Sequence, residues 1–343
     1  MNTSSKPRLV WIDTAKGICI LLVILSHTTT NIFSLSHSLC YMMEAVRMPL
    51  YYTIAGFFVF VSSKMEFLTK KINRLIVPYV FFLILGNLMG YYDSYINNTD
   101  YFYFSSLYFA FTEGKDFQFH NIPIWFLISL FDTYIYYMII DSIAKRINKY
   151  YFLTKLLLSL FLGLCGFICH RLGIDLPFFL DSSMTAFPFF MWGHLLMRKT
   201  TFLSNKRNRW HDFILASILL FLAFILAKGH ISYHINNMPT TILHIYGVGI
   251  LGVTGLLLLS KSINYFPIIS YIGRYSIVYL GTHTLFFRHV KRIVENNCEI
   301  NNNIIQDLSV FVIVVVLSSL SCVILRKTVP WFIAQKDFMS FRF

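Results

Sequence analysis

Charged residues are scarce in this sequence. Asp, Glu, Lys and Arg make up 13% of the 343 residues, whereas hydrophobic residues make up 56% and the mean hydropathy is +0.61. Soluble domains have about 25% charged residues, so the composition excludes an ordinary soluble domain. It predicts an all-α, polytopic integral membrane protein.

Cysteine is also scarce, and no metal-binding pattern is present. Cys165 and Cys169 are four residues apart in an apolar stretch that has no further ligand pair. Four histidines are also candidate ligands, but their spacing does not match two metal ligands on one helix: His194, His230, His234 and His244. We therefore predict no metal. Cys40 and Cys298 fall in predicted outer loops, so a disulfide between them is an alternative. For the other cysteines, small buried apolar side chains are the simpler interpretation.

A cleavable signal is missing too. Lys6 and Arg8 precede the first apolar stretch, but no small-residue cleavage site follows it, so we expect this span to be retained. Stretches of about 20 apolar residues predict transmembrane helices. Ten such spans are predicted, at 12–33, 42–62, 73–92, 122–140, 152–169, 179–197, 212–229, 240–260, 271–289 and 304–325.

The distribution of Lys and Arg predicts the orientation of these spans. With the N-terminus inside, 22 of the 29 Lys and Arg residues fall on the cytoplasmic side. An even number of spans then places both termini in the cytoplasm. The net charge of +13 is thus mainly a topology signal, and we expect no nucleic acid partner. The chain ends soon after the last span, which predicts one transmembrane domain over residues 1–343 with no attached soluble domain.

The first span carries an unusual polar stripe. At about 100° per residue, Asp13, Lys16, His27 and Asn31 share one helix face. Charged groups near the bilayer centre cost about 2.5–3.5 kcal/mol, so this face should line protein or water. Lys16 and His27 are about 16 Å apart along the axis, which favours a path over one compact site. Alternatives remain: Lys16 snorkels to the interface, Asp13 caps the helix, or His27 is a packed core group.

The sequence of this first span resembles a known family. "WIDTAKGICILLVILSH" (11–27) is similar to the opening of the membrane-bound acyltransferase family three, in its fucose O-acetylase-like branch. That opening has an Asp, a cation followed by Gly, an apolar run and then a His. Here these residues are Asp13, Lys16, Gly17 and His27.

Later segments resemble the family in the same order. Ala55 stands where the family usually has Ser, and Arg47 stands where many members have His. The ordered motifs favour an acyltransferase over a generic transporter. They are "RMPLYYTIAGFFVF" (47–60), "KKINRLIVPYVFF" (70–82), "IPIWFLISLF" (122–131) and "IGRYSIVYLGTHTLF" (272–286).

The resemblance implies an O-acyltransferase of the bacterial inner membrane. Such an enzyme moves an acetyl group from acetyl-CoA to a hydroxyl of a cell-surface saccharide, such as a capsule or O-antigen sugar. The resemblance implies that His27 is the catalytic base, with Lys16 on the donor side and Asp13 orienting it. Lys71 and Arg74 would meet the phosphates of CoA, although they also fit positive-inside topology alone.

Four further residues are predicted on the acceptor side: Asn31, Arg47, Trp125 and His283. The predicted partners are the saccharide, free or lipid-linked, and membrane lipid. Trp125 also fits an interfacial anchor, and His283 a packed core histidine. The main alternative function is a transporter or flippase of a lipid-linked saccharide or small polar solute, because intramembrane Asp, Lys and His also suit a proton relay. A succinyl donor and a non-catalytic envelope scaffold are further alternatives.

Overall fold

In the part of the chain that the computed structural model describes, all regular secondary structure is helical, and one isolated β-bridge joins Ser232 and Asn237. The all-α prediction is therefore confirmed. The described residues are 8–29, 36–61, 63–97, 121–199, 202, 208–297 and 302–339.

Ten of the described helices have 18 residues or more. Each overlaps one of the ten predicted spans. They are α1 (Val10–Thr28), α3 (His37–Phe57), α5 (Val77–Asn97), α7 (Trp125–Ile147), α8 (Tyr151–Leu172), α9 (Leu180–Lys199), α10 (Arg209–Leu226), α11 (Ile242–Ile263), α13 (Ser276–Asn297) and α14 (Asn303–Thr328). Shorter helices are α4 (Lys64–Lys71), η1 (Ile72–Ile76), η2 (Ile122–Ile124), η3 (Pro177–Phe179) and α12 (Pro267–Arg274).

Seven helical segments of the described chain are long and apolar enough to cross a membrane. The helices α3, α9 and α13 are equally long but more polar. The C-terminal half of α13, for example, carries Arg288, Lys291 and Arg292. The chain is thus a multi-pass membrane protein. The ten spans and the cytoplasmic termini remain predictions.

Two predicted spans differ from the observed helices. The span predicted at 271–289 is broken at Tyr275, where α12 ends and α13 begins. The span predicted at 73–92 belongs to one continuous helical run over 64–97, which contains the π-helix η1. Such π-turns inside helices occur frequently at functional sites. Hydropathy reveals neither feature, because it follows the polarity of side chains and not the hydrogen-bonding pattern of the backbone.

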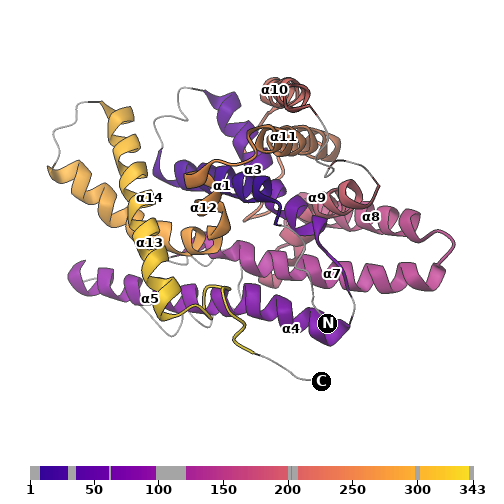
Figure 1. Ribbon diagram of the computed structural model, residues 1–343, viewed down its shortest axis with the longest axis horizontal. Helices are drawn as coiled ribbons and strands as arrows, with labels where there is room; N and C mark the ends of the chain where they lie inside the picture. Colours follow the sequence, from indigo (N-terminus) through magenta and orange to yellow (C-terminus); the bar gives the residue numbers. More distant parts are fainter. Residues whose placement is uncertain are drawn as a thin grey trace.

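Helix α1 lies inside the bundle, next to α3, α11, α12, α13 and α14. In Figure 1, α1 and α12 lie between α10 and α11 at the top and α7 with α4–α5 at the bottom. Eleven of the 19 residues of α1 are buried, including Trp11, Ile20 and Ile24. Its polar side chains therefore face protein rather than lipid, as the polar stripe predicted.

Two glycines allow α12 to pack directly against α1. A Cβ atom on Gly17 would collide with the Ile269 carbonyl, and one on Gly273 would collide with the Asp13 carbonyl. Gly56 of α3 and Gly193 of α9 form a similar contact, in which each lies against the backbone of the other helix. Small residues permit such close approach between membrane helices. The two crossings fix α1 and α3, the helices that carry the site.

Candidate active site

A cavity of about 270 Å³ lies at the Lys16 end of α1, and three cationic side chains line it. Lys16 comes from α1, Lys71 from the end of α4 and Arg74 from η1. Among the described residues that line this cation cavity, none is acidic. Its chemistry therefore favours an anionic ligand such as a phosphate group.

Aromatic packing and a helix terminus complete the cation cavity. The Lys71 Nζ lies 3.5 Å from the centre of the Tyr134 ring, a cation–π contact that holds the ammonium at the wall. Ser276, the first residue of the 22-residue α13, also lines the cavity. The first turn of a helix has free N–H groups and a positive dipole end, which favour bound anions. These features add to the charge of the three cations.

A second cavity, of about 190 Å³, lies at the His27 end of α1. We call it the histidine cavity. His27, Arg47 and Trp125 line it, together with residues of the α10–α11 loop. Among the described residues, the ring nitrogens of His27 have no hydrogen-bond partner. An imidazole that lines a cavity without such a partner is available to exchange a proton with a ligand.

His283 lies next to His27, with their ring centres 5.4 Å apart. Its side chain is fully buried, and its Nδ1 is 2.8 Å from the Tyr279 carbonyl oxygen. Because a carbonyl only accepts, Nδ1 donates to it, and in the neutral imidazole Nε2 then carries the lone pair. Among the described residues, the buried Nε2 has no hydrogen-bond partner. His283 is thus a fixed neighbour of His27.

Arg47 supplies the positive charge of the histidine cavity. Its guanidinium donates to the Ser26 hydroxyl on α1, and its carbonyl accepts a 2.7 Å contact from the Cys19 thiol. Arginine keeps its charge at any physiological pH and presents several donors in a fixed plane. A developing oxyanion in this cavity would therefore have a cation beside it.

Leu280 lines both cavities. It lies one helical turn before His283 on α13. Lys16 and His27 thus lie in two different cavities, about 16 Å apart along the axis of α1. A path between them stays a prediction.

A family model described as an acyltransferase domain matches residues 9–327, which include both cavities. The chain belongs to acyltransferase family 3. This match confirms the resemblance seen in the motifs, and it shows that the protein is a membrane acyltransferase. No curated protein and no solved structure matches the chain.

Most of the predicted site residues of this family-3 acyltransferase lie at the two cavities. Lys16, Lys71 and Arg74 all line the cation cavity. Arg47 and Trp125 line the histidine cavity with His27. His283, predicted on the acceptor side, lines neither cavity and instead lies beside the His27 ring. Asn31 lies outside the described residues. The roles of all these residues remain predictions.

Asp13 requires a correction. The sequence predicted that its carboxylate orients Lys16, three residues away. In the structure Arg8 binds both carboxylate oxygens, with Nε 2.6 Å from Oδ2 and Nη2 2.9 Å from Oδ1. The planar guanidinium matches a carboxylate better than an ammonium does. Asp13 therefore acts on Lys16 through charge alone, while Arg8 holds its oxygens.

Sequence analysis missed several residues of the histidine cavity. Tyr233 and His234 come from the loop between α10 and α11, and Glu44 comes from the first half of α3. A bridge between Ser232 and Asn237 folds this loop into a tight turn over the cavity. Trp125 packs against His234, with ring centres 5.6 Å apart. The loop is polar and has no family motif, so its sequence did not indicate that these residues belong to a site.

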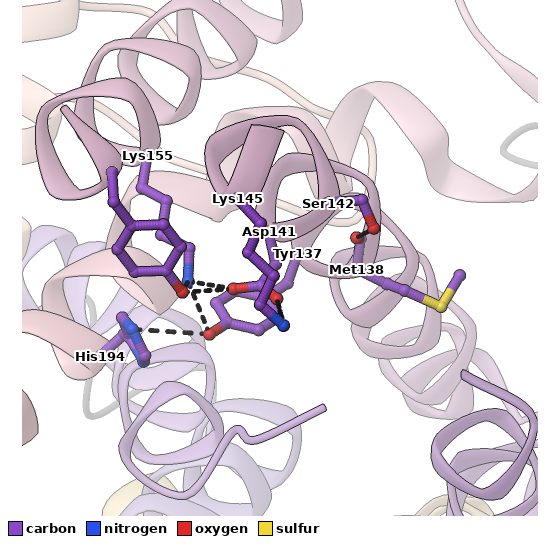
Figure 2. Close-up of polar contacts among 8 residues, drawn as sticks. Tyr137, Met138, Asp141, Ser142, Lys145, Lys155 and His194 are labelled. Carbon is purple, nitrogen blue, oxygen red and sulfur yellow. Dashed lines mark hydrogen bonds and ion pairs between the residues drawn. The ribbon is translucent and has the colours of Figure 1, made fainter. Parts of the chain in front are cut away.

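A second polar cluster of the family-3 acyltransferase lies between α7, α8 and α9, outside both cavities. Figure 2 shows Lys155 and Asp141 side by side, with Tyr137 and His194 adjacent. The Lys155 Nζ is 2.5 Å from Asp141 Oδ1 and 2.9 Å from the Tyr137 hydroxyl. The Lys155 side chain is fully buried. The cluster joins three helices and has the features of a structural network.

Proposed function

We propose that the chain is an acetyl-CoA-dependent O-acyltransferase of the bacterial inner membrane that acetylates a hydroxyl of a cell-surface saccharide. The membership in acyltransferase family 3 supports acyl transfer. The observation that carries the finer proposal is the pair of cavities along α1, one lined by three cations and the other by His27 and Arg47. A donor with charged phosphates and a reactive thioester fits such a division.

The cation cavity is the proposed donor site. Lys16, Lys71 and Arg74 would contact the phosphates of CoA, which are the most highly charged part of the donor. The flexible arm of CoA separates its thioester from these phosphates, so the reacting carbon is expected some distance away. The predicted cytoplasmic N-terminus supports this assignment, because it places the cation cavity on the side where CoA is made.

The histidine cavity is the proposed reaction site. His27 takes the proton of the sugar hydroxyl as that oxygen attacks the thioester carbonyl. The carbonyl oxygen becomes an oxyanion, which the Arg47 guanidinium stabilises. The new C–O bond forms, the C–S bond breaks, and the proton held by His27 passes to the departing CoA sulfur. A short-lived acetyl-imidazole on His27 is the other route with the same products.

Two neighbours complete the proposed reaction site. His283 is a positioning residue, because its fixed tautomer presents a lone pair next to the His27 ring and can accept an imidazole N–H. Trp125 lines the cavity and offers an aromatic surface to the acceptor. Both residues were predicted on the acceptor side, and Trp125 keeps that role in the proposal.

CoA binding tests the donor site directly. We expect Lys71→Met, in full-length protein purified in detergent, to weaken CoA binding about ten- to a hundredfold, because a contact to a charged group contributes about 1.5–3 kcal/mol. Lys70→Met is the matched control, since the adjacent Lys70 is 56% exposed and paired with Glu66. Equal weakening by both variants would show a general charge effect and would remove the cation cavity from the proposal.

The acetyl content of purified surface glycan tests the reaction. We compare cells that carry wild type, a deletion, His27→Ala and the control His211→Ala, at matched membrane levels; His211 is exposed on α10. The proposal expects acetyl to be lost in the deletion and in His27→Ala only. Retention of acetyl in His27→Ala would exclude His27 as the base. Unchanged acetylation with less glycan would instead favour a transporter.

A further inference from the structure

Three candidate metal ligands meet at the rim of the histidine cavity. Cys40 and Glu44 are four residues apart on α3, and His230 comes from the α10–α11 loop, 186 residues after Glu44. Their ligand atoms all lie within 4.8 Å of one another. Glu44 also lines the histidine cavity. The site therefore lies next to that cavity.

The distances from Glu44 to the other two ligands match those around a tetrahedral ion. The Cys40 Sγ is 3.5 Å from Glu44 Oε1, and the His230 Nδ1 is 3.3 Å from the same carboxylate. Metal–ligand bonds of about 2.0–2.3 Å at tetrahedral angles place ligand atoms about 3.3–3.7 Å apart. Zn²⁺ could therefore be held with only small side-chain movements.

Charge and surroundings also favour a cation here. Glu44 Oε2 is buried and, among the described residues, accepts no hydrogen bond, so it has capacity for a further ligand. A thiolate and a carboxylate together would neutralise a divalent ion. The Tyr41 ring packs edge-on against His230 at 4.7 Å, and the Asn237 side chain donates to the His230 carbonyl. These contacts hold the imidazole toward α3.

We propose that Cys40, Glu44 and His230 bind Zn²⁺. Thiolate, carboxylate and imidazole are all zinc ligands, and sites with three protein ligands leave a fourth position for an oxygen from water or substrate. The prediction of no metal rested on spacing along the sequence, which does not reveal a third ligand from a distant loop. This site is independent of the acyl transfer proposed above.

Metal binding by full-length protein in detergent tests the site. We expect one Zn²⁺ per chain by equilibrium dialysis, and a sulfur-to-cobalt charge-transfer band when Co²⁺ is used as the probe. Cys40→Ser and His230→Ala should each raise the dissociation constant at least about a hundredfold, since even outer-shell changes cost about 10–100-fold. Ser at 40 can still donate to Glu44, so this variant keeps the hydrogen bond while it removes the thiolate.

Cys165→Ser is the matched control, because Cys165 is a half-buried free thiol that belongs to no such group among the described residues. It should leave both zinc affinity and the cobalt band unchanged. Absence of stoichiometric Zn²⁺, a cobalt spectrum without the sulfur band, or equal loss in the Cys165→Ser protein would each overturn the proposal. Those results would leave a hydrogen-bonded Cys40–Glu44–His230 cluster.

Discussion

The buried ion pair of Figure 2 allows a quantitative prediction of stability. The Lys155 Nζ contacts Asp141 Oδ1 at 2.5 Å, the Tyr151 hydroxyl at 2.6 Å and the Tyr137 hydroxyl at 2.9 Å. Lys155→Met keeps most of the side-chain volume but removes the ammonium. Breaking a buried pair by removal of one partner costs about 3–5 kcal/mol. Asp141 keeps Lys145 at 2.7 Å and the Tyr151 hydroxyl at 2.5 Å, so we expect about 3 kcal/mol.

The assay is the free energy of unfolding in detergent micelles titrated with a denaturing detergent. Lys145→Met is the control, because Lys145 binds the same carboxylate but is 58% exposed. It should cost less than about 1 kcal/mol. In the double variant Lys155→Met/Asp141→Asn, the loss should be smaller than the sum of the single losses. If Lys155→Met costs no more than Lys145→Met, the pair does not stabilise the fold in the way argued here.

Two other predictions concern the helix crossing and Leu280, which lines both cavities. Gly273→Ala should lower the thermal midpoint sharply, because the new methyl group would collide with the Asp13 carbonyl and force α12 away from α1. Gly247→Ala, with open space at its Cβ position, should be neutral or slightly stabilising; equal midpoints would contradict the close packing. Leu280→Ala should raise the rate with butyryl-CoA relative to acetyl-CoA about tenfold, as expected when a pocket gains room for methylene groups. An unchanged ratio of the two rates would show that Leu280 does not limit the size of the acyl group.

Hydrophobic length predicted the positions of the long helices well, because each needs about 20 apolar residues whatever its neighbours are. Helical periodicity likewise placed Lys16 and His27 on one inward face. The break at Tyr275 and the π-helix were not predictable, since both are changes of backbone hydrogen bonding that hydropathy does not report.

Long-range partners were the other limit of sequence reasoning. The resemblance implied Lys16 as the partner of Asp13, but Arg8 reaches the carboxylate from the other direction. Tyr233 and His234 reach the histidine cavity only because the α10–α11 loop folds over it. Spacing along one helix cannot reveal residues that tertiary folding supplies.

The position of the Asp141–Lys155 pair has a consequence for biogenesis. Asp141 lies on α7 and Lys155 on α8, and only residues 148–150 separate these two helices. The pair can therefore form within a single helical hairpin, before α9 leaves the ribosome. Asp141 lies in the last two turns of α7 and Lys155 in the second turn of α8, so both are near the turn of this hairpin. A hairpin that pairs these two charges as it forms can enter the bilayer with them already neutralised, and Lys155→Met would leave Asp141 with only Lys145, the exposed one of its two lysine partners.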